Sequence, residues 1–178
     1  MLNLKIFIVM KRLLMLVALL SISTMAMAQK SDSYFSLSGV AKSGGANLMN
    51  FDDEFAFSDV ELVYGYHFND KWSLHVPFTG SQAMNTKFHT YSDICFLGLG
   101  GEYKFHKTNV SEYSVVANIQ TTVGKSDWKG VMAYDLSVKD EFDNVQIAVG
   151  VRYFDAQKSF IPNRLCLYAS FGFTLDLK

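Results

Sequence analysis

Beyond its first 28 residues, the 178-residue sequence lacks any long uninterrupted apolar run. A transmembrane helix needs about 20 consecutive apolar residues, so none is predicted in this part of the chain. The i, i+3, i+4 spacing of an amphipathic helix is missing there as well. Because 49% of the residues are nevertheless hydrophobic and 15% aromatic, these side chains are expected to lie on strands.

The sequence also lacks a surplus of basic residues. Three of its 16 lysines and arginines lie within residues 1–28 and none of its 17 aspartates and glutamates does, so residues 29–178 carry a net charge of −4. A protein that binds nucleic acid needs basic side chains to neutralise phosphates. The sequence therefore predicts no nucleic-acid partner.

Only two cysteines, Cys95 and Cys166, are present, and both fall within alternating, strand-like stretches. Their positions in the alternation place Cys95 on the apolar face and Cys166 on the polar one. Side chains on opposite faces of a sheet point apart, so two free thiols are predicted.

Metal-binding and cofactor motifs are missing too. The four histidines, at positions 67, 75, 89 and 106, lack the close spacing of metal ligands on one element. The acidic segment 52–54 could bind calcium, but it is expected to be a solvated loop. No metal and no cofactor is predicted.

The N-terminus has the composition of a secretory signal peptide. Basic residues precede the apolar run 13–20, and the small residues Ala26-Met27-Ala28 follow it. A basic region, a short apolar core and an A-x-A cleavage site together direct export. Residues 1–28 are therefore predicted to be a cleaved signal peptide, with Met10 as a second possible start, and residues 29–178 to form one domain.

The stretch 58–80 shows what the rest of the chain is expected to form. Apolar residues occupy every second position of its two arms, 59–68 and 72–79, and the segment between them, 69–71, has the composition of a turn. A period of two over about ten residues predicts a strand, and two such strands with a tight joint predict a hairpin. An apolar face that ends in aromatic residues is typical of barrel strands that cross an outer membrane.

The same alternation recurs along the chain and predicts eight strands. They are expected at residues 33–43, 59–68, 72–79, 93–105, 112–123, 128–139, 145–153 and 165–177. Long connections, such as 44–55 and 81–92, alternate with short turns. The pattern predicts an all-β fold, an eight-stranded antiparallel up-and-down transmembrane β-barrel. Its sheet is expected to close, because an open edge would leave unpaired N–H and C=O groups in hydrocarbon.

Charged residues on the inward positions predict a lumen that is filled rather than open. The polar network is expected to include Glu61, His75, Glu102, Lys104, Asp135, Lys139 and Arg152. A static network of ion pairs is the favoured interpretation, and a charged gate on a narrow ion path is the alternative.

Aromatic residues next to the short turns predict a girdle at the periplasmic interface. Its expected members are Tyr66, Phe68, Trp72, Tyr103, Phe105 and Tyr113. The long loops at the other end are then extracellular.

The leader ending in Ala26-Met27-Ala28, the hairpin VELVYGYHFNDKWSLHVPF and the closing strand LCLYASFGFTLDL together resemble small outer-membrane barrels of Gram-negative bacteria. This group contains the OmpA transmembrane domain, OmpX and OmpW, and the resemblance covers the whole chain without selecting one member. It implies a porin-like protein of the cell envelope, embedded as a monomer in outer-membrane lipid and lipopolysaccharide.

The function expected first is a structural or interaction role without enzymatic activity, in envelope integrity or in adhesion and binding through the surface loops. A narrow channel or a conduit for small hydrophobic molecules is the alternative. A lipid A-modifying enzyme would need serine and histidine near the outer leaflet, whereas His75 is expected in the lumen nearer the turns. A soluble lipocalin-like binder would turn its apolar face inward.

Overall fold

The computed structural model describes residues 33–85, 90–124, 128–156 and 162–177. The predicted signal peptide lies outside these ranges. Within them, no helix is long and apolar enough to cross a membrane.

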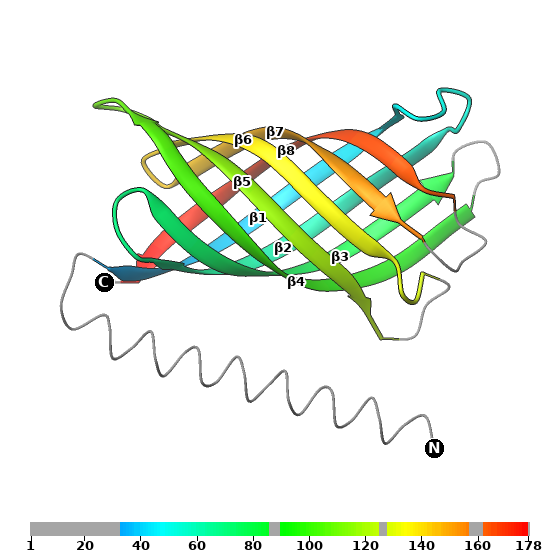
Figure 1. Cartoon of the computed structure of the whole chain (residues 1–178), viewed down its shortest axis with the longest axis horizontal. Coiled ribbons are helices and arrows are strands. Elements are labelled where there is room, and N and C mark those ends of the chain that lie inside the picture. The colour runs from blue at the N-terminus through cyan, green and yellow to red at the C-terminus, as the bar shows by residue number, and fades with distance from the viewer. Residues whose placement is uncertain (1–32, 86–89, 125–127, 157–161, 178) are drawn as a thin grey trace, which may run out of the picture. The chain divides into compact units, whose positions relative to one another are not determined.

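Eight strands follow one another along the described chain. They are β1 (Tyr34–Asn47), β2 (Phe55–His67), β3 (Trp72–Asn85), β4 (Thr90–Lys107), β5 (Glu112–Val123), β6 (Met132–Phe142), β7 (Val145–Asp155) and β8 (Arg164–Leu177). Each strand pairs antiparallel with the next, and β8 pairs with β1, so the sheet closes into a barrel (Figure 1). The predicted eight-stranded antiparallel barrel is confirmed.

The connections between the strands gather at two ends of the barrel. The turns β2–β3, β4–β5 and β6–β7 lie at one end, on the left in Figure 1, and we name it the turn end. The strand ends that the other four connections join lie at the opposite end, the loop end. Phe35 of β1 pairs with Leu177 of β8, so the first strand begins and the last strand ends at the turn end.

Several strands extend further at the loop end than the alternation predicts. The prediction of a long polar loop at 81–92 is wrong, because β3 continues to Asn85 and pairs there with Thr90 of β4. The predicted loop 44–55 likewise contains the last residues of β1 and the first of β2. In the β2–β3 ladder, for example, pairing continues through the outward polar residues Ser58 and Gln82, where the hydropathy no longer alternates.

Both limits of β6 also differ from the prediction. The strand begins at Met132 rather than at Trp128, because residues 128–131 form a turn. It also continues through Phe142, so the tight joint to β7 is the pair Asp143-Asn144, with Asp143 in the left-handed region at φ 54°.

Buried and exposed residues alternate along the strands, but here the polar side chains are buried and the apolar ones exposed, the reverse of a soluble protein. The outward residues Leu62 and Val149 are 55% and 61% exposed, whereas the inward residues Glu61 and Arg152 are 2% and 0% exposed. Cys95 is exposed and Cys166 buried, and both are free, as predicted. The barrel therefore presents apolar side chains to its surroundings and encloses its charges.

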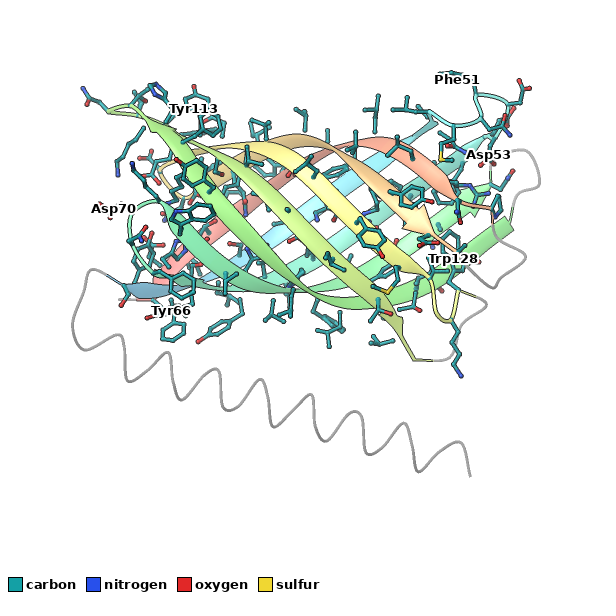
Figure 2. The ribbon with its side chains drawn as sticks, in the orientation of Figure 1. Phe51, Asp53, Tyr66, Asp70, Tyr113 and Trp128 are labelled. Carbon is teal, nitrogen blue, oxygen red and sulfur yellow. The ribbon has the colours of Figure 1, made fainter. Side chains whose placement is uncertain are left out.

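The loop end of the lumen is filled by apolar side chains that the sequence analysis missed. This cluster, which we name the apolar seal, consists of Phe55, Phe57, Ala83, Ile94, Phe96, Trp128, Val131, Ala133, Phe154, Ala156, Cys166 and Tyr168. Trp128 and Val131 come from the turn before β6 rather than from a strand, and Trp128 lies at the loop end in Figure 2. Their inward direction explains why β6 begins later than predicted.

We expect Phe154→Ala to lower the free energy of unfolding by about 3–5 kcal/mol, the usual cost of removing a buried phenylalanine side chain. The Phe154 ring centroid lies 5.5 Å from those of Phe55 and Phe57 and 5.7 Å from that of Trp128. Urea unfolding of the refolded protein in detergent micelles measures the change. Phe173→Ala, at an outward position, is the matched control and should cost less than half as much; equal losses would contradict an interior seal.

Candidate functional site: the charged lumen

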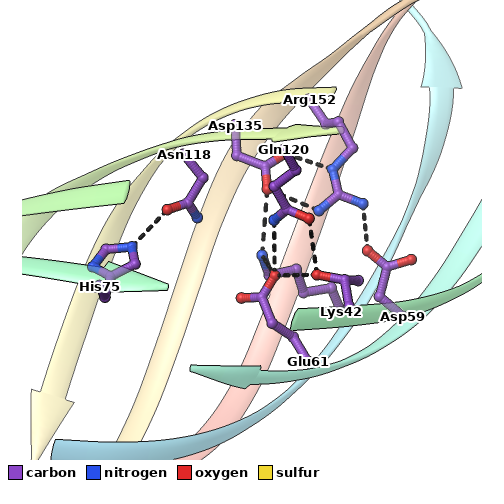
Figure 3. A network of polar contacts seen from close by, with 9 residues as sticks. Lys42, Asp59, Glu61, His75, Asn118, Gln120, Asp135 and Arg152 are labelled. Atoms are coloured by element: carbon purple, nitrogen blue, oxygen red, sulfur yellow. Dashed lines mark hydrogen bonds and ion pairs between the residues drawn. The ribbon is translucent and has the colours of Figure 1, made fainter. Parts of the chain in front are cut away.

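Arg152 of β7 lies at the centre of the lumen, next to the apolar seal. Its Nε donates to Asp135 Oδ1 at 2.5 Å and its Nη2 to Asp135 Oδ2 at 2.8 Å, while Nη1 donates to Asp59 Oδ2 (Figure 3). The side chain is fully buried. Two charge-assisted bonds to one carboxylate fix the plane of the guanidinium.

Lys42 of β1 connects Asp135, one of the two partners of Arg152, to a third acidic residue, Glu61. Its Nζ lies 2.9 Å from Glu61 Oε2 and 3.4 Å from Asp135 Oδ2. The same Glu61 oxygen accepts hydrogen bonds from Thr79 Oγ1 at 2.8 Å and from Gln120 Nε2 at 3.1 Å. We name the resulting set, drawn from six of the eight strands, the central layer. It consists of Lys42, Asp59, Glu61, Thr79, Gln120, Asp135 and Arg152.

Aromatic rings join the central layer to the apolar seal. The Arg152 guanidinium carbon lies 4.8 Å from the ring centroid of Phe57, 5.6 Å from that of Phe154 and 5.8 Å from that of Tyr168. A cation over the faces of aromatic rings is attracted by their quadrupoles, most strongly where water is excluded. The seal and the layer thus form one continuous filling of the loop-end half of the lumen.

A separate group of ion pairs lies nearer the turn end. Lys139 Nζ is 2.7 Å from Glu102 Oε1 and 2.7 Å from Glu141 Oε2. Lys104 Nζ is 2.5 Å from Glu112 Oε2. Opposite charges at these distances largely offset the cost of burying each of them.

The structure places all seven predicted network residues inside the barrel but does not join them into one network. Glu61, Asp135 and Arg152 belong to the central layer, whereas Glu102, Lys139 and Lys104 form the pairs at the turn side. His75 bonds instead to the neutral side chain of Asn118. The predicted network leaves out four residues that complete the central layer, Lys42, Asp59, Thr79 and Gln120, although Lys42 and Asp59 face each other in the β1–β2 register.

The two described lumen histidines bond to neutral partners. His75 Nε2 is 2.6 Å from Asn118 Oδ1, and Gly100 opposite has no room for a Cβ, which would lie 1.8 Å from that oxygen. His67 Nε2 is 3.0 Å from Ser36 Oγ, and its ring stacks on Tyr34 at 4.3 Å. This serine–histidine contact lies at the turn end, away from the loops. Among the described residues there is no group of three or more histidine, cysteine or acidic side chains that could hold a metal ion.

Five of the six predicted girdle residues lie on strand segments next to the turns, and the sixth, Phe68, lies in the β2–β3 turn. The tilted rings of Trp72 and Tyr103 lie 4.5 Å apart between centroids, and Tyr66 meets Phe68 edge to face at 5.1 Å. Tyr66 and Tyr113 both lie at the turn end in Figure 2. Tyr66 is buried because Phe35 covers its other side, 5.0 Å away.

The loop end is held by an ion pair where the sequence predicts a solvated acidic loop. Asp53 Oδ2 accepts from Arg164 Nε at 2.5 Å and from Asn47 Nδ2 at 3.1 Å, while Asp52 is exposed as expected. Burial alone would raise the pKa of Asp53. The hydrogen bond and the charge of Arg164, together with the bond from Asn47, outweigh this and hold that pKa below its usual value. The prediction of a solvated loop is therefore wrong for Asp53.

No family model matches the sequence, and no curated protein does either. Solved structures of designed barrels do. One, described as "De novo design of transmembrane beta-barrels", is 15% identical with a TM-score of 0.45, over 79% of this chain and 95% of that one. Another, "Solution NMR structure of de novo designed TMB2.3", is 13% identical with a TM-score of 0.39, over 81% of this chain and 97% of that one.

Removing Arg152 from the central layer should be strongly destabilising. We expect Arg152→Ala to lower the free energy of unfolding by about 3–5 kcal/mol, because Asp59 is then buried without Arg152 and Asp135 keeps only Lys42. Adding Asp59→Asn and Asp135→Asn to Arg152→Met should recover most of the loss. Urea titration in micelles compares the variants, and a loss for Arg152→Ala no larger than that for the outward Val149→Ala would contradict this role.

The Asp53–Arg164 pair predicts a pH dependence at the loop end. The pKa of Asp53 is lower in the folded protein than in the unfolded chain, where it is about 3.9, so the pair stabilises above that pH and is lost as pH falls through the folded value. A carbon-detected NMR titration of the Asp53 carboxyl group should give a midpoint below about 3.9. Arg164→Gln should raise this midpoint, and no rise would exclude Arg164 as its cause.

Proposed function

We propose that the protein is an integral outer-membrane barrel with a structural or interaction role, without enzymatic activity and without an open channel. The observation that carries this proposal is the reversed polarity of the barrel, with exposed apolar residues outside and buried charges inside. In water such a surface would be a large contiguous apolar patch, which soluble monomers rarely expose. In hydrocarbon the same surface is the stable one.

The dimensions of the barrel support this location. The shortest strands, β6 and β7, have 11 residues each. At about 3.3 Å per residue and a tilt of about 40°, each rises about 28 Å, which is enough to cross the apolar band of about 25 Å in outer-membrane barrels. The closed ladder leaves no unpaired sheet edge in lipid.

The filled lumen favours a structural role over transport. A molecule that crossed the barrel would have to displace both the apolar seal and the central layer, whose side chains are almost all buried. The β1–β2 loop supports an interaction role at the surface. Its Phe51 is 80% exposed and lies at the tip of the loop end in Figure 2, while Asp53 fixes the loop to β8.

The location is tested by fractionation of bacteria that express the full chain. We expect the protein in the detergent-extracted outer membrane, with an unboiled band that migrates faster on a gel than the boiled one, because a closed barrel resists detergent until heated. A protein recovered in the soluble periplasm without a mobility shift would exclude the membrane location.

The closed lumen is tested with the same material in planar bilayers. Folded protein, verified by its mobility shift, should give no single-channel current steps. Steady unitary steps from the wild type would favour the narrow-channel alternative over the structural role.

A further inference from the structure

A carboxylate lies on the outward, apolar face of the barrel near the turn end. Asp140 of β6 follows Leu136 and Val138 at alternate positions, and both of these side chains are exposed. Side chains at alternate positions of a strand point to the same face, so Asp140 points outward with them. Phe142 has the next outward position, and Ile147 of β7 is directly opposite. The acidic side chain is therefore set within a surface that its neighbours make apolar.

No described residue donates a hydrogen bond to this carboxylate. Its Oδ1 is buried and has no partner. Its Oδ2 is not enclosed in the same way, and it too forms no hydrogen bond or ion pair within the described ranges. A buried acceptor without a donor retains the cost of its desolvation. Any donor that Asp140 gains therefore comes from outside these ranges and reaches it at Oδ2.

A hydroxyl group without a partner lies beside this carboxylate. Tyr113 of β5 is directly opposite Asp140 in the β5–β6 ladder, and side chains so placed have Cβ atoms about 5 Å apart. The Tyr113 ring packs beside that of His106, with 5.8 Å between the centroids, and its hydroxyl bonds to none of the described residues. Tyr113 lies at the turn end in Figure 2. The pair thus combines a charged acceptor with a neighbouring donor.

The depth of this pair selects what can reach it. Tyr113 belongs to the aromatic girdle, and in a membrane barrel such a girdle lies at the level of the lipid headgroups. An anionic headgroup would be repelled by Asp140. A headgroup that matches the pair carries a positive donor for the carboxylate and an acceptor for the hydroxyl. A primary ammonium has three N–H donors, whereas a trimethylated nitrogen has the same charge and none.

We propose that Asp140 and Tyr113 bind the headgroup of a phospholipid that carries a primary ammonium group. The ammonium donates to Asp140 Oδ2, and the phosphate accepts from the Tyr113 hydroxyl. The short spacer between these two groups of the headgroup suits side chains that stand on adjacent strands. This inference rests on the proposed function, because it requires the barrel to lie in a membrane, and it names the class of lipid that the barrel holds there.

The full chain, verified as folded by its mobility shift, is placed in nanodiscs that contain phosphatidylethanolamine and phosphatidylcholine in equal amounts with identical acyl chains. Native mass spectrometry then counts the lipids that stay bound to the released barrel. We expect a single phosphatidylethanolamine to be retained at least severalfold more often than phosphatidylcholine. Equal retention from a folded barrel would overturn this inference alone. A chain without the mobility shift in any lipid would overturn the membrane location itself, so the two failures are distinguishable.

Asp140→Asn keeps the shape of the side chain and removes its charge, so the two lipids should be retained equally. Asp93→Asn is the matched control, because Asp93 is an exposed acid near the loop end of β4. This variant should keep the preference of the wild type. A preference that persists in Asp140→Asn, or disappears in Asp93→Asn, would contradict the site.

Tyr113→Phe tests the contact with the phosphate. Both lipids contain this phosphate, so the variant should retain less of each and leave their ratio unchanged. Retention equal to that of the wild type would exclude Tyr113 from the site.

A second measurement needs no variant and serves if Asp140→Asn does not fold. The wild type is placed in nanodiscs with phosphatidylethanolamine that carries one, two or three N-methyl groups. The headgroup charge stays the same while the N–H donors are removed one by one, so retention should fall with each methyl group. Equal retention along the series would show that the ammonium donors play no part and would overturn the inference.

Discussion

Closure of the sheet through the β1–β8 ladder is the constraint on which the rest of the structure depends. Once Phe35 pairs with Leu177 and the ladder runs on toward the loop end, every strand has two neighbours and every side chain lies either inside or outside. An open sheet could place its charged face in water. A closed sheet of eight strands has an interior just wide enough for side chains. The inward charged side chains therefore have to pair with one another instead of with water.

The filling of the lumen follows from this enclosure. Arg152, Lys42 and their carboxylate partners cannot reach solvent, and their mutual pairing replaces hydration. The apolar seal, on their loop-end side, excludes water from that side. One of its rings, Phe57, lies against the Arg152 guanidinium. On the turn side of these residues the lumen contains a cavity of about 70 Å³, with Glu61 and His75 among its lining residues. The loop-end side of the lumen is thus filled by the apolar seal, whereas the turn side is lined mostly by polar residues.

The alternation of residue types was sufficient to predict the strands that cross the apolar band and the side on which each charge lies. It failed where the outward side chains become polar, as in the segment 81–92, because hydropathy then no longer alternates although backbone pairing continues. It also failed for Trp128 and Val131, which enter the lumen from a turn. Asp53 reads as a solvated acid in the sequence because its partner, Arg164, is 111 positions away.

The sequence by itself determined that this chain forms an eight-stranded barrel with apolar residues outside, because side-chain direction in a strand depends only on local position. Only the tertiary structure decided which inward charges meet. Glu61 and Glu102 have the same inward direction, yet one joins Lys42 of β1 and the other Lys139 of β6. Those partners depend on the register of all eight strands and on the stagger at which the barrel closes. Both are set by long-range pairing, which no local pattern records.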